Sequence, residues 1–452
     1  MPRSIPRRLF DLAMPVVGLN VLGVLSLAVD TAMCGRLPEA DRALAAIGFA
    51  GQIVFLLLVG MMGLTVGCVA LVARAHGGRD QPRVEHILLQ SIQLTVLVSV
   101  LVAGVGLLSA ETLLAWQGAT EATRALSLDY LRPLLIFVVF FNLNLLYAGV
   151  LRGVGHSMLP FVVALAYNAL NVVLNYALIF GHWGMPAMGV AGAAWGTVLS
   201  QAVGAVATTW LLARSVVPGV TLRLRPAPLD RPLARLLFRI GFPAALDMVI
   251  VNLAFFTVVG MLARIAEIAV AAHTVGLRVQ SLAFVPGLGV AQATGAMVGQ
   301  ALGAGRVDEA RAVTRASLAL ACAIMTVLGL VIVLGAEWII AVVFHVDAGT
   351  PLSTYALTWM RLLGLSMPVM GLHIALIGAL RGAGATNTSL AINVLGTLAF
   401  QVPLSYVLGF TLGWGPFGIW LAMAPLSFVV KLVLGLLAYR EGSWAKVGLT
   451  ER

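Results

Sequence analysis

The stretch Ala-Gly-Val-Leu-Arg-Gly-Val-Gly at 148–155 has a near copy, Ile-Gly-Ala-Leu-Arg-Gly-Ala-Gly, at 377–384, which lies 229 residues later. The same spacing separates Arg132 from Arg361. Both of these arginines precede the arginine of their own copy by 20 residues. Ordered matches of this kind indicate an internal duplication, so the fold of one half is expected to recur in the other.

Two further pairs extend the duplication to the first helices of the halves. Pro15 matches Pro243 and Arg36 matches Arg264, both at a spacing of 228 residues. The chain therefore divides into two halves of similar length, and a Pro- and Arg-rich segment at 214–239 is the natural place for them to join. We predict a first lobe at 1–213, a linker at 214–239 and a second lobe at 240–452.

The composition is that of an integral membrane protein. Hydrophobic residues make up 60% of the 452 positions, charged residues only 10%, and the mean hydropathy is +1.01. A soluble domain carries about 25% charged residues, so a soluble chain of this composition would have no way to cover its surface. Runs of about 20 apolar residues fit helices that cross a bilayer. We predict twelve: 10–33, 44–73, 87–109, 126–151, 159–181, 189–213, 240–263, 268–300, 314–335, 353–380, 389–411 and 416–438.

The basic residues fix the expected orientation. With the N-terminus in the cytoplasm, 20 of the 28 Lys and Arg residues fall on the inner side, 5 on the outer side and 3 within spans. This asymmetry follows the positive-inside rule and explains the net charge of +10 without nucleic acid. We expect a multi-pass protein of the bacterial cytoplasmic (inner) membrane with both termini in the cytoplasm.

Six helices per half mean that both halves insert the same way up. The predicted fold is therefore all-α, with two six-helix bundles related by a pseudo-two-fold axis along the membrane normal. Transporters of this build bind substrate between the halves and open alternately to each side.

The motifs resemble those of the multidrug and toxic compound extrusion (MATE) family. The resemblance rests on Val-Asp-Thr-Ala-Met-Cys-Gly-Arg-Leu at 29–37, on Asn-Ala-Leu-Asn-Val-Val-Leu-Asn-Tyr-Ala-Leu-Ile-Phe-Gly at 168–181 and on the twin Leu-Arg-Gly turns. It covers essentially the whole chain and implies a cation-driven exporter.

Asp30 lies well inside the first predicted helix. An aspartate near a helix centre costs about 2.5–3.5 kcal/mol on insertion scales, so it needs a compensating role. One interpretation is an interfacial carboxylate that pairs with Arg36 or water. The other is a cation or proton site. The duplication favours the second, because Val258 stands at the matching position and the fold does not require an acid there.

Three asparagines follow a helical spacing in the fifth predicted helix. Asn168, Asn171 and Asn175 are spaced i, i+3 and i+7, which places them on one face. They either form hydrogen bonds between helices or supply oxygen ligands to a hard cation. The family resemblance implies that Asp30, Asn171 and Asn175 form a cation site, with Na⁺ as a candidate ion and Thr197 as a further ligand. Some branches have an aspartate where Asn175 stands, which argues against a two-carboxylate proton relay here.

Four other polar residues are candidates for a substrate cavity: Asn20, Asn144, Asp247 and His373. Asn144 and His373 match each other at the 229-residue spacing, although a packing role fits them as well. Asp247 could line the cavity and attract cations, or pair with a neighbouring helix. The resemblance gives no second cation site in the second half, because Val251 and Met370 stand where one family branch has acids.

Pro15 and Pro243 fall inside the first and seventh predicted helices. Proline removes a backbone donor and kinks a helix. We expect these kinks either to be static or to serve as gating elements.

The leading hypothesis is a monomeric antiporter, driven by Na⁺ or H⁺, that exports cationic or amphipathic organic compounds and contacts membrane lipids. The alternative is a flippase or exporter of a lipid-linked saccharide or other metabolite. No catalytic constellation, nucleotide-binding motif or cofactor motif is visible, so we expect neither an enzyme nor a bound cofactor.

Overall fold

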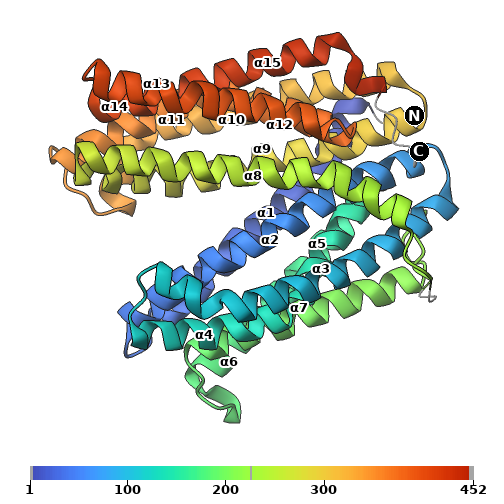
Figure 1. Ribbon diagram of the computed structural model, residues 1–452, viewed down its shortest axis with the longest axis horizontal. Coiled ribbons are helices and arrows are strands. Elements are labelled where there is room, and N and C mark those ends of the chain that lie inside the picture. The colour runs from blue at the N-terminus through green and yellow to red at the C-terminus, as the bar shows by residue number, and fades with distance from the viewer. Residues whose placement is uncertain (1–3, 224–226, 447–452) are drawn as a thin grey trace. The chain divides into compact units, whose positions relative to one another are not determined.

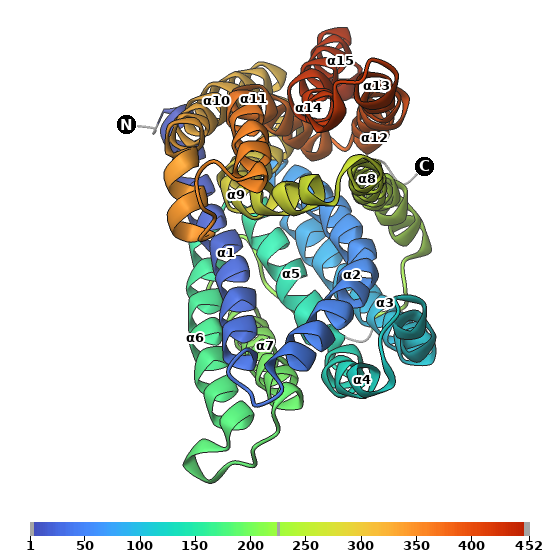
Figure 2. The ribbon, with the colours of Figure 1, turned by 90° about the vertical axis from the view of Figure 1, so that its left-hand side faces the viewer.

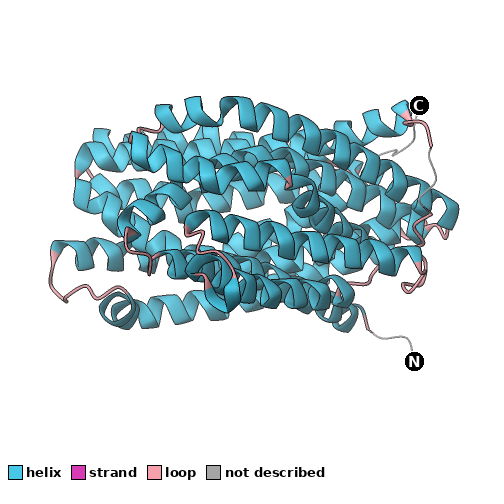
Figure 3. Cartoon of the chain, turned by 90° about the horizontal axis from the view of Figure 1, so that it is seen from below, coloured by secondary structure: helices cyan, strands magenta, loops and turns pink. Residues whose placement is uncertain are grey.

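The computed structural model describes residues 4–223 and 227–446, which are built of helices joined by short loops (Figure 3). Within this described part, eleven helical segments are long and apolar enough to span a membrane, and one bent pair supplies a twelfth. Each of the twelve predicted spans coincides with one of these segments, so the all-α membrane fold is confirmed. The chain ends, with Arg3 and Arg452, and Arg225 lie outside the described residues.

The chain forms two compact units (Figure 1). We call Gly18–Phe242 the N-unit, and the described residues up to Val17 together with those from Pro243 onward the C-unit. The division therefore falls inside two helices, close to Pro15 and at Pro243. This division differs from the predicted one, whose lobe boundaries at 213 and 240 stand on either side of the linker.

The N-unit is built from six spans. Its helices α6 and α7 run side by side (Figure 2). They are so close that a Cβ at Gly192 of α7 would overlap the Leu178 backbone of α6. Small residues allow this close approach of membrane helices. The elements are α1 (Ile5–Cys34), α2 (Ala40–Gly77), α3 (Gln81–Trp116), α4 (Glu121–Ile136), α5 (Val138–Gly153), α6 (Met158–Phe180), η1 (His182–Gly184), α7 (Val190–Ala213) and the first part of α8 (Arg231–Ile265).

The fourth span is bent. Helices α4 and α5 meet at Phe137 at an angle of 54°, and Pro133 lies one turn before the bend. The predicted run at 126–151 is therefore one broken helix, not a straight one.

The C-unit contains the remaining spans and several π-helical turns. Its elements are α9 (Glu267–Gly303), α10 (Val307–Trp338), η2 (Ile339–Val343), α11 (Pro351–Gly382), α12 (Thr386–Val394), η3 (Leu395–Gln401), α13 (Val402–Tyr406), η4 (Val407–Thr411), α14 (Gly415–Leu421), η5 (Ala422–Leu426), α15 (Ser427–Glu441) and η6 (Ser443–Lys446). The π-helical turns η3 and η4 lie in the eleventh span, and η5 lies in the twelfth.

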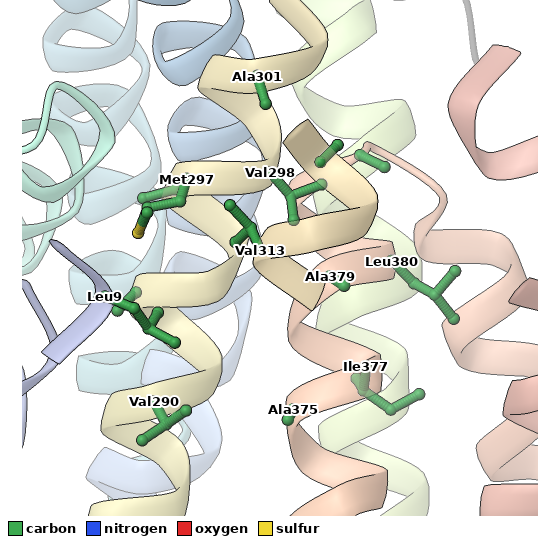
Figure 4. Packing of buried hydrophobic residues seen from close by; sticks show 14 of the residues in the cluster. Leu9, Val290, Met297, Val298, Ala301, Val313, Ala375, Ile377, Ala379 and Leu380 are labelled. Carbon is green, nitrogen blue, oxygen red and sulfur yellow. The ribbon is translucent and has the colours of Figure 1, made fainter. Parts of the chain in front are cut away.

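Helices α1 and α8 each begin in one unit and continue into the other. The first part of α1 packs in the C-unit core, where Leu9 joins Val290 and Met297 of α9 (Figure 4). The first part of α8 packs in the N-unit, where a Cβ at Gly241 would overlap the Gly63 carbonyl of α2. Each unit is therefore completed by the opening turns of the other half's first helix.

The duplication recurs in the helix-ending turns. In both copies of the duplicated Leu-Arg-Gly motif the helix ends at the glycine, which is Gly153 in α5 and Gly382 in α11. Two residues later, Gly155 and Gly384 both adopt a left-handed conformation. The turns after α2 and α9 also match. In the first of them, however, the left-handed position is occupied by Arg79 (φ 59°), where the second has Gly305 (φ 71°).

The predicted linker at 214–239 is only partly a loop, because α8 begins at Arg231. Its last loop residues are held to α3. Gln90 donates from Nε2 to the Pro228 carbonyl at 3.0 Å and accepts the Asp230 N–H at 2.9 Å. The Leu233 N–H and the His86 ring, 2.8 Å away, hold the pKa of Asp230 below its usual range. This aspartate caps α8 and fixes its start.

We expect Arg79→Gly to raise the apparent thermal midpoint of the purified protein in detergent. A left-handed conformation costs a non-glycine residue about 1–2 kcal/mol, and glycine removes that strain. Arg79→Gln removes the charge and keeps the strain, so it should leave the midpoint unchanged. Gly305→Ala should lower the midpoint. Equal midpoints for wild type and Arg79→Gly would contradict the strain assignment.

Candidate functional site

Asp30 is buried in the last turns of α1, with 5% of its surface exposed. Its Oδ1 accepts a hydrogen bond of 2.5 Å from Asn175 Nδ2 on α6. The Thr197 hydroxyl of α7 also interacts with this carboxylate. The interpretation in which Asp30 pairs with Arg36 at the interface has no support among the described contacts, because the partners of Asp30 come from the interior of the unit.

The two asparagines of the predicted site lie beside each other and are buried. Asn171 donates from Nδ2 to Thr197 Oγ1 at 3.2 Å and, more weakly, to Asn175 Oδ1 at 3.5 Å. Ser26, one turn before Asp30, donates to Asn171 Oδ1 at 3.3 Å. Asp30, Asn171, Asn175 and Thr197 thus form one cluster, as the sequence predicted, and Ser26 completes it.

Gly196 on α7 makes the cluster possible. A Cβ at this position would overlap the Asn175 amide oxygen. The glycine therefore lets α7 approach α6 closely enough for Thr197, the next residue, to reach Asp30 and Asn171. The packing of two helices and the polar cluster depend on the same missing side chain.

The cluster carries one acid and no base. Among residues 4–223 and 227–446, Asp30 has no recorded hydrogen bond or ion pair with an Arg, Lys or His side chain. The side chains that form hydrogen bonds with it are amides and hydroxyls. Tyr130 and Cys34 lie within range of an electrostatic interaction with its charge. A buried carboxylate without a cationic partner is costly. The arrangement therefore favours uptake of a proton or a metal cation from solution.

The ligand set suits a hard cation. Carboxylate, amide and hydroxyl oxygens are hard donors, in contrast to thiolate or imidazole. In the part of the chain that the structure describes, no group of three His, Cys, Asp or Glu side chains is placed to hold a metal ion. A cation here would thus depend on the asparagine and threonine oxygens, and the Asn175 amide would have to turn its oxygen toward it.

A small cavity of about 40 Å³ lies next to the cluster, at the bend between α4 and α5. Phe137 and Phe141 line it from the bend, and Thr197 and Gln201 line it from α7. Its volume is sufficient for about one water molecule. The lining is otherwise apolar, so it offers a water few polar partners, and Thr197 borders both this cavity and the carboxylate cluster.

The other first-half candidates lie apart from Asp30. Asn168 donates to the Ala164 carbonyl on its own helix at 2.7 Å, so the third asparagine does not join the cluster. Asn144 donates to the Gln201 backbone and side-chain oxygens at 2.9 and 2.7 Å. Asn20 has a buried amide nitrogen with no partner among the described residues. Their role as substrate-cavity residues stays a prediction.

Asp247 is buried in the C-unit and forms an ion pair. Its Oδ2 accepts from Arg381 Nη2 at 2.6 Å and from Asn393 Nδ2 at 2.9 Å, with Ser389 at 3.4 Å. Of the two interpretations of Asp247, the structure shows the pairing with a neighbouring helix. Arg381 belongs to the duplicated turn, and its pairing was not predicted, because nothing in the sequence distinguishes it from Arg152.

His373 lies near the same group. Its ring meets the Asn393 side chain and packs against Phe428 at a centroid distance of 5.8 Å. His373 and Asp247 thus belong to one polar cluster of the C-unit, whereas Asn144, the sequence counterpart of His373, is bonded to Gln201.

We expect Arg381→Leu to lower the free energy of unfolding by about 3 kcal/mol, since breaking a buried pair leaves a charge unpaired. Combining it with Asp247→Asn should recover part of that loss. Denaturant titration of the purified protein measures both effects. Arg361→Leu serves as the control, because its 2.9 Å pair with Glu337 is exposed and should contribute little. A double variant no more stable than Arg381→Leu would argue against the coupling.

Known proteins resemble the chain over nearly its whole length. The model of the MatE family matches residues 15–177 and again 243–407, in two copies that begin at Pro15 and Pro243. The chain is 28% identical to a probable multidrug resistance protein NorM of Thermotoga maritima, over 99% of this chain and 95% of the relative. It is 27% identical to a probable multidrug resistance protein YoeA of Bacillus subtilis, over 99% and 96%.

Solved structures share the fold. A multidrug resistance MATE family transporter in an outward-facing conformation superposes with a TM-score of 0.90 at 24% identity, covering 99% of this chain and 98% of the other. A MATE structure in the bent conformation gives 0.89 at 22% identity, with 99% and 98% covered.

Proposed function

Because the chain belongs to the MatE family, and is therefore a transporter and not an enzyme, we propose that it is a cation-coupled antiporter that exports cationic or amphipathic organic compounds. The observation that carries the proposal is the buried Asp30 carboxylate, which is surrounded by neutral oxygen ligands and has no cationic partner among the described residues. The names of the related multidrug resistance proteins support drugs as the substrates.

The contrast between the two units supports coupling at Asp30. Both units bury one aspartate, but Asp247 has Arg381 at 2.6 Å and Asp30 has amide and hydroxyl partners. A carboxylate with a fixed guanidinium is neutralised permanently. A carboxylate without one must take a cation from solution, and its charge then changes during a transport cycle. We propose that Asp30 binds Na⁺ or H⁺ with Asn171, Asn175 and Thr197.

Cation binding would act through α1. This helix carries Asp30 in the N-unit and its opening turns in the C-unit, with Pro15 near the boundary. A change in how tightly Asp30 is held by α6 and α7 would bias the bend at Pro15, and Pro243 occupies the matching place in α8. We propose that these two prolines are the hinges of alternating access.

We also propose where the protein is located and in which oligomeric state it works. We place the protein as a monomer in the cytoplasmic membrane of a bacterium, with both termini on the cytoplasmic side, since 20 of its 28 basic residues fall there on the predicted topology. No cofactor is required beyond the coupling ion.

We expect Asp30→Asn to abolish ion-driven efflux of a fluorescent organic cation from proteoliposomes, because the neutral amide can neither be protonated nor neutralise a bound cation as the carboxylate does. Na⁺ and H⁺ gradients are imposed separately, and the gradient that drives the wild type identifies the coupling ion. Asp41→Asn, at the exposed start of α2, should transport normally. Undiminished ion-driven efflux by Asp30→Asn would refute the assignment.

With Na⁺ as the coupling ion, we expect Asn175→Leu to raise the concentration needed for half-maximal efflux about tenfold, which corresponds to about 1.4 kcal/mol for one lost ligand. With H⁺, the half-maximal concentration should fall instead, because Asn175 donates to the Asp30 carboxylate and stabilises its charged form. Asn168→Leu is the matched control, because the same amide on the same helix lies outside the cluster. Equal half-maximal concentrations for the two variants would show that Asn175 is not a ligand.

A further inference from the structure

The C-unit buries a lysine that the proposed transport cycle does not use. Lys431 lies in α15, within the last membrane-spanning segment, with 6% of its surface exposed. The sequence contains only one other lysine, Lys446, which is exposed. A charged side chain inside a span is costly and normally marks a function or an ion pair.

The charges around Lys431 do not balance. The carboxylate that acts electrostatically on it is Asp247, which is already paired with Arg381 at 2.6 Å. The remaining titratable neighbour, His373, brings no negative charge. With Lys431 protonated, two cations share one carboxylate among the described residues, and the cluster has one surplus positive charge in a medium of low dielectric constant.

The Lys431 ammonium makes only a weak hydrogen bond within the described residues. Its Nζ lies 3.5 Å from Gln401 Oε1, at the limit of a hydrogen bond, and 5.1 Å from the centre of the Phe428 ring. The Gln401 oxygen also accepts a shorter bond of 3.1 Å from Ser427. The buried hydroxyl of Thr397 has no partner within the described residues. An ammonium and a hydroxyl are therefore left able to donate to a ligand.

The backbone is shaped around this lysine. A Cβ at Gly396 would overlap the Lys431 side chain, so the glycine makes room for it. Gly396, Thr397 and Gln401 all lie in the π-helical turn η3, and Ser427 follows the π-helical turn η5. Such turns are rare and are frequently found at functional sites. Two of them flank the surplus charge.

We propose that the C-unit holds a binding site for a small monovalent anion, such as chloride or a compact carboxylate, whose charge is matched by Lys431. The anion would accept from the Lys431 ammonium and the Thr397 hydroxyl and neutralise the cluster. Asp247 Oδ1, buried without a described partner, limits the site to one small anion that lies away from it. The proposal does not depend on coupling at Asp30.

The test uses the purified full-length protein in detergent, at constant sodium concentration and ionic strength, with sodium gluconate replaced stepwise by sodium chloride or sodium acetate. We expect the apparent thermal midpoint to rise by about 1–2 °C when a small anion reaches tenfold its dissociation constant. The rise should be lost in Lys431→Met and retained in Lys446→Met and in Asp30→Asn. The chloride and acetate arms distinguish a halide site from a carboxylate site.

A wild-type midpoint that is the same in all three salts would overturn the proposal, as would a full rise in Lys431→Met. If Lys431→Met does not fold, binding of radiolabelled chloride and of radiolabelled acetate to the wild type decides. Saturable binding of either anion that its unlabelled form displaces supports the site, and the absence of saturable binding of both refutes it. A midpoint that depends on pH but not on the anion would show that Lys431 is accommodated uncharged.

Discussion

A carboxylate buried in a membrane helix has to be neutralised, and the two units of this protein do so differently. In the C-unit, Arg381 reaches Asp247 at 2.6 Å and makes the neutralisation permanent. In the N-unit, the hydrogen bond from Asn175 stabilises Asp30 without cancelling its charge. The free energy still required must come from a solute cation. This requirement connects the small-residue packing of α6 and α7, which brings amide and hydroxyl oxygens to Asp30, with the ion coupling that we propose.

The duplication explains why this difference is informative. The two halves share their helix order, their prolines and the left-handed turns after α5 and α11. A polar residue found in only one half is not needed to build the fold. Asp30 in the first half and Lys431 in the second are both of this kind, and both are buried. The shared residues describe the scaffold, and the unshared ones show where each unit has acquired chemistry of its own.

Most of the fold could be predicted from the sequence, because membrane spans are apolar over their whole length and basic loops separate them. The cluster of Asp30, Asn171, Asn175 and Thr197 was also predictable, although only the family resemblance linked residues on three helices. Asn168 fits the same helical spacing but bonds its own helix at Ala164, because adjacent positions on a broad helix face can point to different neighbours.

Other features left no signal in the sequence. Pairing of Arg381 with Asp247 depends on which helices become neighbours, and hydropathy carries no such information. The unit boundaries near Pro15 and Pro243 were missed for the same reason, since a chain is normally divided at its loops. The bend at Phe137 was missed because an apolar run has the same composition whether it is straight or broken.

The exchange of opening helical turns between the units has a consequence for biosynthesis. The N-unit includes the turns of α8 up to Phe242, so it stays incomplete until the ribosome has made the start of the second half. The turns of α1 up to Val17 are made first, yet their packing partners on α9 and α11 emerge much later. Neither half can therefore finish folding as an independent product, and the last step of assembly has to be made by both together.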